Sequence, residues 1–143
     1  MARRPGGWRL IGTWNTDGIL GTVARMSDVL DLPIPFGALR VGASRTMRFE
    51  GKDYGSGISF FFVDNDPGMG PGLHRHPYTE TWTVVDGEAT ITIDGRAIVA
   101  RAGDTAVVAA NTWHGFTNTG EGALRILCIH DSPEIIQEFL DEE

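Results

Sequence analysis

A chain of 143 residues, 41% of them hydrophobic and 22% charged, is long enough for one sizeable core and has the composition of an ordinary globular domain. Its formal net charge of −7 argues against nucleic acid as a partner, because phosphate binding needs clustered Lys and Arg, and the twelve basic residues are scattered apart from Arg3 and Arg4. Cys128 is the only cysteine, so an intrachain disulfide is excluded and a reducing compartment is expected.

The N-terminus begins MARRPGG, a basic start that would suit a secretion signal. No continuous apolar segment follows it, since Gly12, Asn15 and Asp17 interrupt the sequence. The longest apolar runs, such as ISFFFV, are also far too short to cross a bilayer. We therefore expect a soluble, cytoplasmic protein without a membrane partner.

Residues 1–43 show little periodicity. Residues 10–26 suggest a loose hairpin, and residues 27–37 suggest a turn or short helix interrupted by Pro33 and Pro35. The region is rich in large apolar side chains, which a soluble chain does not leave exposed. We expect an N-terminal extension that either covers its own subunit or exchanges a strand with a second copy, which would make the protein a homodimer. The apolar side chains are Trp8, Leu10, Ile11, Trp14, Ile19, Leu20 and Val23.

From Ser44 onward the chain has the pattern of short strands separated by turns, with nineteen glycines dispersed along the sequence. In the segment ATITI, alternate residues can face a core while Thr90 and Thr92 face water. The sequence therefore predicts an all-β domain, a compact barrel or jelly roll. The expected strands lie in residues 44–50, 58–63, 81–85, 89–93, 96–100, 105–109 and 124–130.

Asp-Gly pairs separate three of these strands, at Asp86-Gly87 and Asp94-Gly95. Both central residues of a type I′ turn need positive φ, which Asp-Gly supplies. We therefore predict two tight hairpins and a meander over residues 81–100.

The C-terminal segment has the features of a short helix. Ser132 suits the N-cap, Pro133 suits the first helical position, and EIIQEFLDEE follows. Its apolar stripe would consist of Ile135, Ile136, Phe139 and Leu140.

Two histidines, His74 and His76, stand one residue apart in the segment LHRHPYTE. In a strand they would point the same way, roughly 6.6 Å apart along the chain, so both imidazoles could reach one ion. Glu80 would lie roughly 13 Å beyond His76 in an extended chain, which is too far for it to join them. We therefore expect the chain to bend at Pro77, so that Glu80 begins the next strand beside the histidines.

A fourth ligand would have to come from another strand, and His114 and His130 are the remaining histidines. His114 comes just after an apolar strand, once the hairpins have returned the chain. Neutral imidazoles with one carboxylate suit Fe, Mn, Ni, Zn or Cu, and an octahedral ion with four protein ligands keeps two positions for a substrate or O₂.

With these residues the sequence resembles the cupins. Their first motif, G-x5-H-x-H-x3-E-x6-G, is met at Gly68, His74, His76, Glu80 and Gly87.

Their second motif, G-x5-P-x-G-x2-H-x3-N, is met at Gly103, His114 and Asn118. Ala109 replaces the motif proline, and Asn111 replaces the glycine. Asn is the residue other than glycine that best tolerates a left-handed conformation, so we expect Asn111 to preserve the turn.

The resemblance extends over about residues 44–131. It implies a cupin-type jelly-roll β-barrel of six to eight strands, which with the terminal helix would occupy residues 44–143. It also implies one divalent metal ion inside the barrel, and it is usual for such barrels to form homodimers. The implied metal ligands are His74, His76, Glu80 and His114.

The resemblance does not select one reaction, since cupins include oxygenases, isomerases, decarboxylases, storage proteins and sensors. Our first hypothesis is a mononuclear metal-dependent enzyme acting on a small organic molecule, with oxygenase chemistry slightly favoured. The alternative is a non-catalytic barrel that senses or stores a small ligand. A sensor usually carries a DNA-binding domain, and the sequence shows none.

Four further side chains have expected roles. Trp82 shares strand parity with Glu80, and Phe116 shares it with His114, so both should line the interior, as core or as substrate contacts. His130 ends a strand and is expected to have a structural role near the helix start. Cys128 is expected to be a buried apolar filler.

Overall fold

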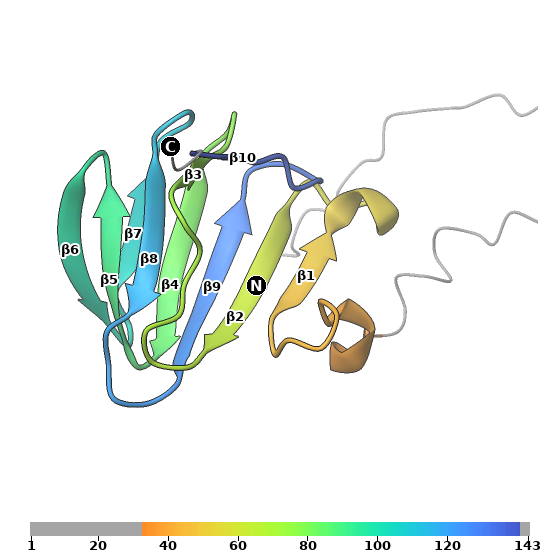
Figure 1. Ribbon diagram of the computed structural model, residues 1–143. Coiled ribbons are helices and arrows are strands. Elements are labelled where there is room, and N and C mark those ends of the chain that lie inside the picture. The colour runs from red at the N-terminus through yellow and green to blue at the C-terminus, as the bar shows by residue number, and fades with distance from the viewer. Residues whose placement is uncertain (1–32, 141–143) are drawn as a thin grey trace, which may run out of the picture.

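The computed structural model describes residues 33–140, which form two antiparallel five-stranded sheets arranged as a jelly roll (Figure 1). The first sheet has the strand order β1-β2-β9-β4-β7, and the second has β10-β3-β8-β5-β6. Two short 3₁₀ helices, η1 (Phe36–Leu39) and η2 (Gly51–Asp53), flank β1. The strands are β1 (Met47–Glu50), β2 (Ser59–Asn65), β3 (His74–Arg75), β4 (Glu80–Asp86), β5 (Glu88–Ile93), β6 (Arg96–Arg101), β7 (Thr105–Val108), β8 (His114–Asn118), β9 (Leu124–His130) and β10 (Glu138–Phe139).

This architecture confirms the predicted all-β jelly roll. Every expected strand is present, with bounds shifted by a few residues at most. The hairpin and the apolar cluster expected within residues 1–32 lie outside the described residues. Within residues 33–140, no helix has the length and apolar character needed to cross a membrane.

The core lies between the two sheets and is built in layers. Side chains alternate along a strand, so every second residue of β4 and β9 points inward. The register places Trp82 opposite Cys128, and Val84 opposite Ile126. One layer further along, Glu80 lies opposite His130. The same strands therefore supply the apolar core and, at one end, a layer of ionisable side chains.

The hairpin predicted at Asp94-Gly95 is confirmed. Asp94 and Gly95 both have positive φ, 49° and 74°, and they join the paired strands β5 and β6. In the strand that precedes this turn, Ala89 and Ile91 are buried as expected.

The hairpin predicted at Asp86-Gly87 is wrong. β4 and β5 do not pair with each other but belong to different sheets, so the chain crosses the barrel at this point. Only Gly87 has positive φ, at 88°, and a Cβ there would lie 2.6 Å from the carbonyl oxygen of Ala123. The glycine is required by a close backbone approach rather than by a type I′ turn.

The C-terminal helix is also wrong, because residues 132–140 form bends and the two-residue strand β10. Glu134 bonds locally to the Ser132 hydroxyl, whereas three other backbone N–H groups bond to distant parts of the barrel. The Ile135 N–H donates to the Glu50 carboxylate, the Ile136 N–H to the Tyr78 hydroxyl, and the Leu140 N–H to the Leu73 carbonyl. A helix this short is marginal by itself, so these tertiary bonds decide the conformation.

We call residues 132–140 the C-terminal strap. It runs from the side of β1, where Lys52 pairs with Glu134 at 2.9 Å, to β3, where Arg75 pairs with Glu138 at 2.8 Å. Figure 1 shows it crossing one end of the barrel, above β9 and β3.

Candidate metal centre

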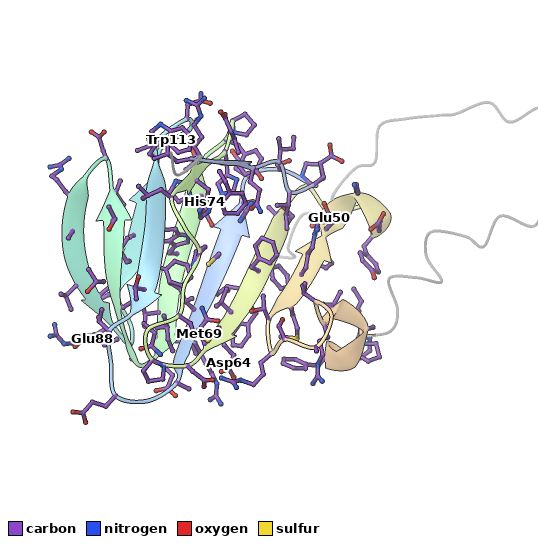
Figure 2. All side chains as sticks on the ribbon, viewed as in Figure 1. Glu50, Asp64, Met69, His74, Glu88 and Trp113 are labelled. Carbon is purple, nitrogen blue, oxygen red and sulfur yellow. The ribbon has the colours of Figure 1, made fainter. Side chains whose placement is uncertain are left out.

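The predicted ligands come from both sheets and meet inside the barrel under the C-terminal strap. β3 and β8 pair with His74 directly opposite His114, which brings two imidazoles from one sheet together. The chain then bends at residues 77–78, as predicted, and crosses to the other sheet, where Glu80 begins β4. Figure 2 places His74 at the end of the barrel beneath the strap.

The four ligand groups form a compact, buried cluster. One ligand atom from each residue lies within 4.8 Å of the others, and no residue is more than 6% exposed. Glu80 Oε2 is central to the cluster, lying 2.7 Å from His114 Nε2 and 3.2 Å from His76 Nε2. The cluster contains His74, His76, Glu80 and His114.

Backbone carbonyls fix the orientation of each histidine in this cluster. His74 Nδ1 lies 2.8 Å from the Gly72 carbonyl, and His114 Nδ1 lies 2.6 Å from the Thr112 carbonyl. His76 Nδ1 lies 2.7 Å from the carbonyl of Ile136 in the strap. Because a carbonyl can only accept, each Nδ1 carries the proton, and each Nε2 directs a lone pair into the cluster.

The inner atoms of the cluster lack hydrogen bonds. His76 Nε2, His114 Nε2 and Glu80 Oε2 are all buried without a partner, since their short mutual contacts lack hydrogen-bond alignment. Unpaired buried polar atoms are costly, and a cation would satisfy all three at once. The donor set of three imidazoles and one carboxylate therefore fits a divalent transition metal ion.

The protonation states also suit a cation. Burial lowers the pKa of His74 to about 4, against the opposing effect of the Gly72 carbonyl, so its imidazole is neutral at pH 7. Burial would raise the pKa of Glu80, but contacts with His114, His130 and His76 outweigh it and hold the pKa far below its usual range. Glu80 is therefore an anion, and His74 beside it is neutral.

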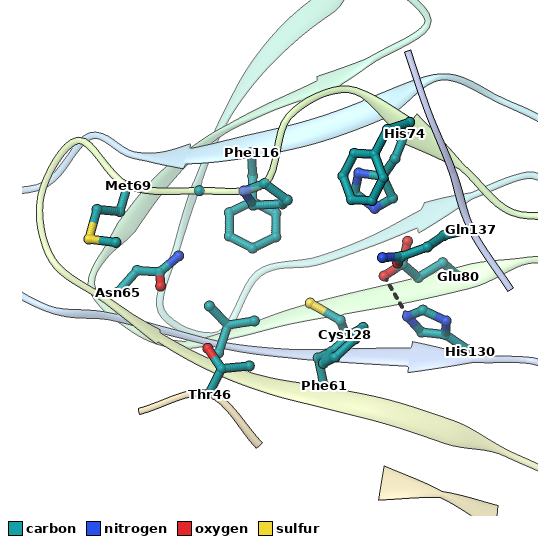
Figure 3. Close-up of a pocket in the computed structure, with 14 residues that line it drawn as sticks. Thr46, Phe61, Asn65, Met69, His74, Glu80, Phe116, Cys128, His130 and Gln137 are labelled. Carbon is teal, nitrogen blue, oxygen red and sulfur yellow. Dashed lines mark ion pairs between the residues drawn. The ribbon is translucent and has the colours of Figure 1, made fainter. Parts of the chain in front are cut away.

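A cavity of about 280 Å³ opens directly onto the cluster. Figure 3 shows His74, Glu80, His130 and Gln137 at one end, with Asn65 and Met69 at the other. The walls between these ends are mainly apolar. They include Phe61, Val63, Phe116 and Cys128.

Comparison with known proteins agrees with this geometry. Residues 61–130 match the cupin domain family. The chain carries a cupin domain. The match lies within the segment of about residues 44–131 over which the sequence motifs predicted it. Comparison with curated proteins gives no match.

Several solved cupin structures have the same fold. An oxalate oxidase is 25% identical with a TM-score of 0.61, and the match covers 66% of this chain and 54% of that one. The oxalate decarboxylase of Lactobacillus farciminis is 25% identical with a TM-score of 0.65, covering 82% and 41%. A cupin 2 domain-containing protein from Halorhodospira halophila is 26% identical with a TM-score of 0.60, covering 71% and 73%. The chain thus spans about half the length of the oxalate oxidase.

The cupin motif positions that are not ligands shape the backbone. Gly68 and Gly103 have positive φ, at 83° and 93°. Asn111, which replaces a motif glycine, has a φ of 60°, as its residue type predicts, and its N–H donates to the His76 carbonyl at 2.7 Å. Asn118 is buried and bonds to the backbone of Asn65, Gly122 and Gly120.

The two predicted pocket residues have different positions. Phe116 lines the cavity, whereas Trp82 is not among the lining residues and packs edge-on against Phe116 and His114, with ring centroids 5.2 and 5.3 Å away. Trp82 therefore belongs to the core behind the site. Cys128 is buried as expected, and it also faces the cavity.

His130 is the site residue that the sequence reasoning missed. It does not lie near a helix start, since residues 131–140, the described residues that follow it, contain no helix. Its Nε2 lies 3.1 Å from Glu80 Oε1, and the residue is 1% exposed. Strand alternation carried the signal, because His130 shares parity with the core residues Ile126 and Cys128 of β9.

Proposed function

We propose that this cupin is a mononuclear metal-dependent enzyme acting on a small organic molecule, with oxygenase chemistry slightly favoured over isomerase or decarboxylase chemistry. The observation that supports this proposal is the cavity that opens onto His74 and Glu80. A ligand in that space would lie against the metal cluster and between mainly apolar walls. Metal-binding geometry without adjoining space would favour a structural ion instead.

The bound ion would supply Lewis-acid activation of a substrate oxygen or, if redox-active, a site for O₂. His74, His76, Glu80 and His114 would hold it, with each imidazole oriented by a backbone carbonyl. Phe61 and Phe116 would position the substrate between them. Trp82 would support Phe116 from behind rather than touch the substrate.

The cavity favours a neutral, largely apolar substrate. Among its described lining residues none is a lysine or an arginine, and the one carboxylate is Glu80. A dianion such as oxalate, the substrate named for two of the similar structures, would lack a cationic partner other than the metal itself. Asn65 at the far end offers an amide for one polar group.

Metal analysis followed by a substrate screen tests the proposal. We expect one divalent ion per chain and, for the correct metal, conversion of a neutral apolar compound, with O₂ consumed if the reaction is an oxygenation. The matched control is His114→Ala, which removes one ligand. A protein that takes up no metal after stripping and reconstitution would contradict the metal site itself.

The same screen addresses the alternative, a non-catalytic cupin that senses or stores a ligand. Binding of a compound to the metal-loaded protein, without conversion in either the presence or the absence of O₂, would support that alternative and contradict the enzyme.

We also propose that the protein is a cytoplasmic homodimer in which residues 1–43 contribute to the interface. Light scattering on the full chain and on a chain that begins at Ser44 tests the assembly. We expect a dimer that weakens on truncation. A monomeric full chain, or a truncated chain that dimerises equally well, would contradict this proposal and leave the metal site unaffected.

A further inference from the structure

His130 differs from the three histidines of the metal cluster in the partner of its outer nitrogen. His130 Nδ1 lies 2.9 Å from the Tyr78 hydroxyl, whereas each cluster histidine faces a backbone carbonyl. A carbonyl can only accept, but a hydroxyl can donate or accept. The protonation pattern of His130 is therefore not fixed in the same way.

The surroundings of Tyr78 indicate where its proton goes. Its oxygen accepts a hydrogen bond from the Ile136 N–H at 2.9 Å. Two acceptors are then available for its single proton, the Ile136 carbonyl at 3.1 Å and His130 Nδ1 at 2.9 Å. The Ile136 carbonyl already accepts from His76 Nδ1 at 2.7 Å. The carbonyl has a second lone pair, but His130 Nδ1 is closer to the hydroxyl and has no other partner among the described residues, which favours donation to His130.

The surroundings of the inner nitrogen of His130, Nε2, agree with this proton arrangement. Its Nε2 lies 3.1 Å from Glu80 Oε1, and both side chains are buried. Two lone pairs facing each other there would repel, whereas an N–H at Nε2 would meet a carboxylate oxygen. In the structure Nε2 approaches Oε1 closely, but the two atoms are not aligned as a hydrogen bond.

The two oxygens of Glu80 therefore have separate surroundings. Oε2 faces His76 and His114, which belong to the metal cluster. Oε1 faces His130, which does not belong to the group of ligand atoms lying within 4.8 Å of one another.

We propose that His130 is a positioning residue for the metal centre, which holds Glu80 Oε1 through its Nε2–H while Tyr78 donates to its Nδ1. Glu80 then offers only Oε2 to the ion, and the coordination positions on the cavity side stay available. The inference requires metal binding but not catalysis, so a failure to find a substrate would leave it intact.

The test compares variants that remove or restore the inner donor. His130→Leu removes it, and His130→Gln places an amide N–H near the position of Nε2. Tyr78→Phe keeps the imidazole but removes the hydroxyl that sets its tautomer. Ile126→Val is the matched control, because Ile126 is buried on the same strand and faces the core.

Two readouts are measured on each variant after folding has been checked by circular dichroism. The first is the affinity for Co²⁺ by chelator competition, and the second is the visible spectrum of bound Co²⁺, which reports its coordination. We expect His130→Leu to weaken binding by about 10- to 100-fold, as is typical of residues that orient ligands, and to change the spectrum. His130→Gln and the control should stay within a few-fold of the unmodified protein, and Tyr78→Phe should lie between.

Two results would overturn the inference. Unchanged affinity and spectrum in His130→Leu would show that the contact has no bearing on the ion. A loss in His130→Gln that equals the losses in His130→Leu and His114→Ala would show that His130 is itself a ligand.

Discussion

On β4 and β9, the apolar core is followed by a layer of buried ionisable side chains, which we call the metal layer. Burial favours folding in the core and opposes it in the metal layer. The metal layer contains His74, His76, Glu80, His114 and His130. On β4, Glu80 is followed two residues later by Trp82, and on β9, His130 is preceded two residues earlier by Cys128. Burial of the apolar side chains is favourable by roughly 25 cal/mol per Å². Burial of the ionisable layer leaves several polar atoms without hydrogen bonds. The core therefore stabilises the barrel, whereas the metal layer destabilises it until an ion binds.

The largest expected effect is that of the metal itself. Removal of the ion should lower the free energy of unfolding, because the imidazole and carboxylate lone pairs that bound it are then buried without a partner. At a metal concentration about a thousandfold above its Kd, the gain from binding is about 4 kcal/mol. Thermal melting with increasing metal measures this. Identical melting temperatures for the metal-free and the metal-loaded protein would contradict the idea that the metal layer is destabilising without an ion.

The second effect is in the core. Ile126 is fully buried two layers from Glu80, and Ile126→Ala should cost about 3 kcal/mol through lost burial and the cavity left behind. We expect the same loss with and without metal, and unchanged metal affinity. Urea unfolding of both forms measures it. A cost that depends strongly on the metal would mean that the two layers are coupled.

A smaller effect is expected from pH on the metal-free protein. The usual pKa of His74 is 6.5, and burial lowers it to about 4 in the folded state. Between these values the unfolded chain binds more protons, so the free energy of unfolding should fall as the pH is lowered, by on the order of 2 kcal/mol. Glu80, with its lowered pKa, acts in the same direction below about pH 4.5.

Urea unfolding in the presence of a chelator, at several values of pH, measures this dependence. A His74→Phe variant should have a flatter profile between pH 6.5 and 4, because the titrating imidazole is absent. A profile in the unmodified protein that is flat over this range would contradict the expectation.

The smallest expected effect is a difference in metal affinity between substitutions of two histidines in the metal layer. His114→Ala removes a ligand, whereas His130→Ala removes a contact to Glu80 Oε1. We expect the first substitution to lower metal affinity at least about tenfold more than the second, whose loss should resemble that of other ligand-orienting residues. Chelator competition measures both. Equal losses would place His130 among the ligands.

Local patterns in the sequence predicted the parts of the fold and site that depend on nearby residues. The spacing of His74 and His76, together with the bend before Glu80, follows from strand geometry and proline chemistry. The φ of Asn111 follows from its residue type. In each case the determining interaction lies within a few residues of the position concerned.

Three features that depend on partners distant in the sequence were not predicted. The Asp-Gly pair at Gly87 is typical of a hairpin turn, and a local pattern gives no information on the contact between Gly87 and the Ala123 backbone. The C-terminal strap has the sequence pattern of a helix, but it bonds to Glu50, Tyr78 and Leu73, which are distant in the sequence. A structural role was expected for His130, because its position opposite Glu80 follows only from the register between β4 and β9.

The site extends beyond the segment that matches the cupin family, because the Ile136 carbonyl in the strap orients His76. A fragment cut at residues 61–130 would match the whole cupin family pattern and contain all four ligands. It would nevertheless lack the acceptor that orients His76 and the N–H that binds Tyr78. During synthesis, the same atoms join the barrel only after every ligand has been made. The backbone carbonyl and N–H of residue 136 therefore complete the surroundings of the metal centre. This contribution comes from the main chain and not from the isoleucine side chain.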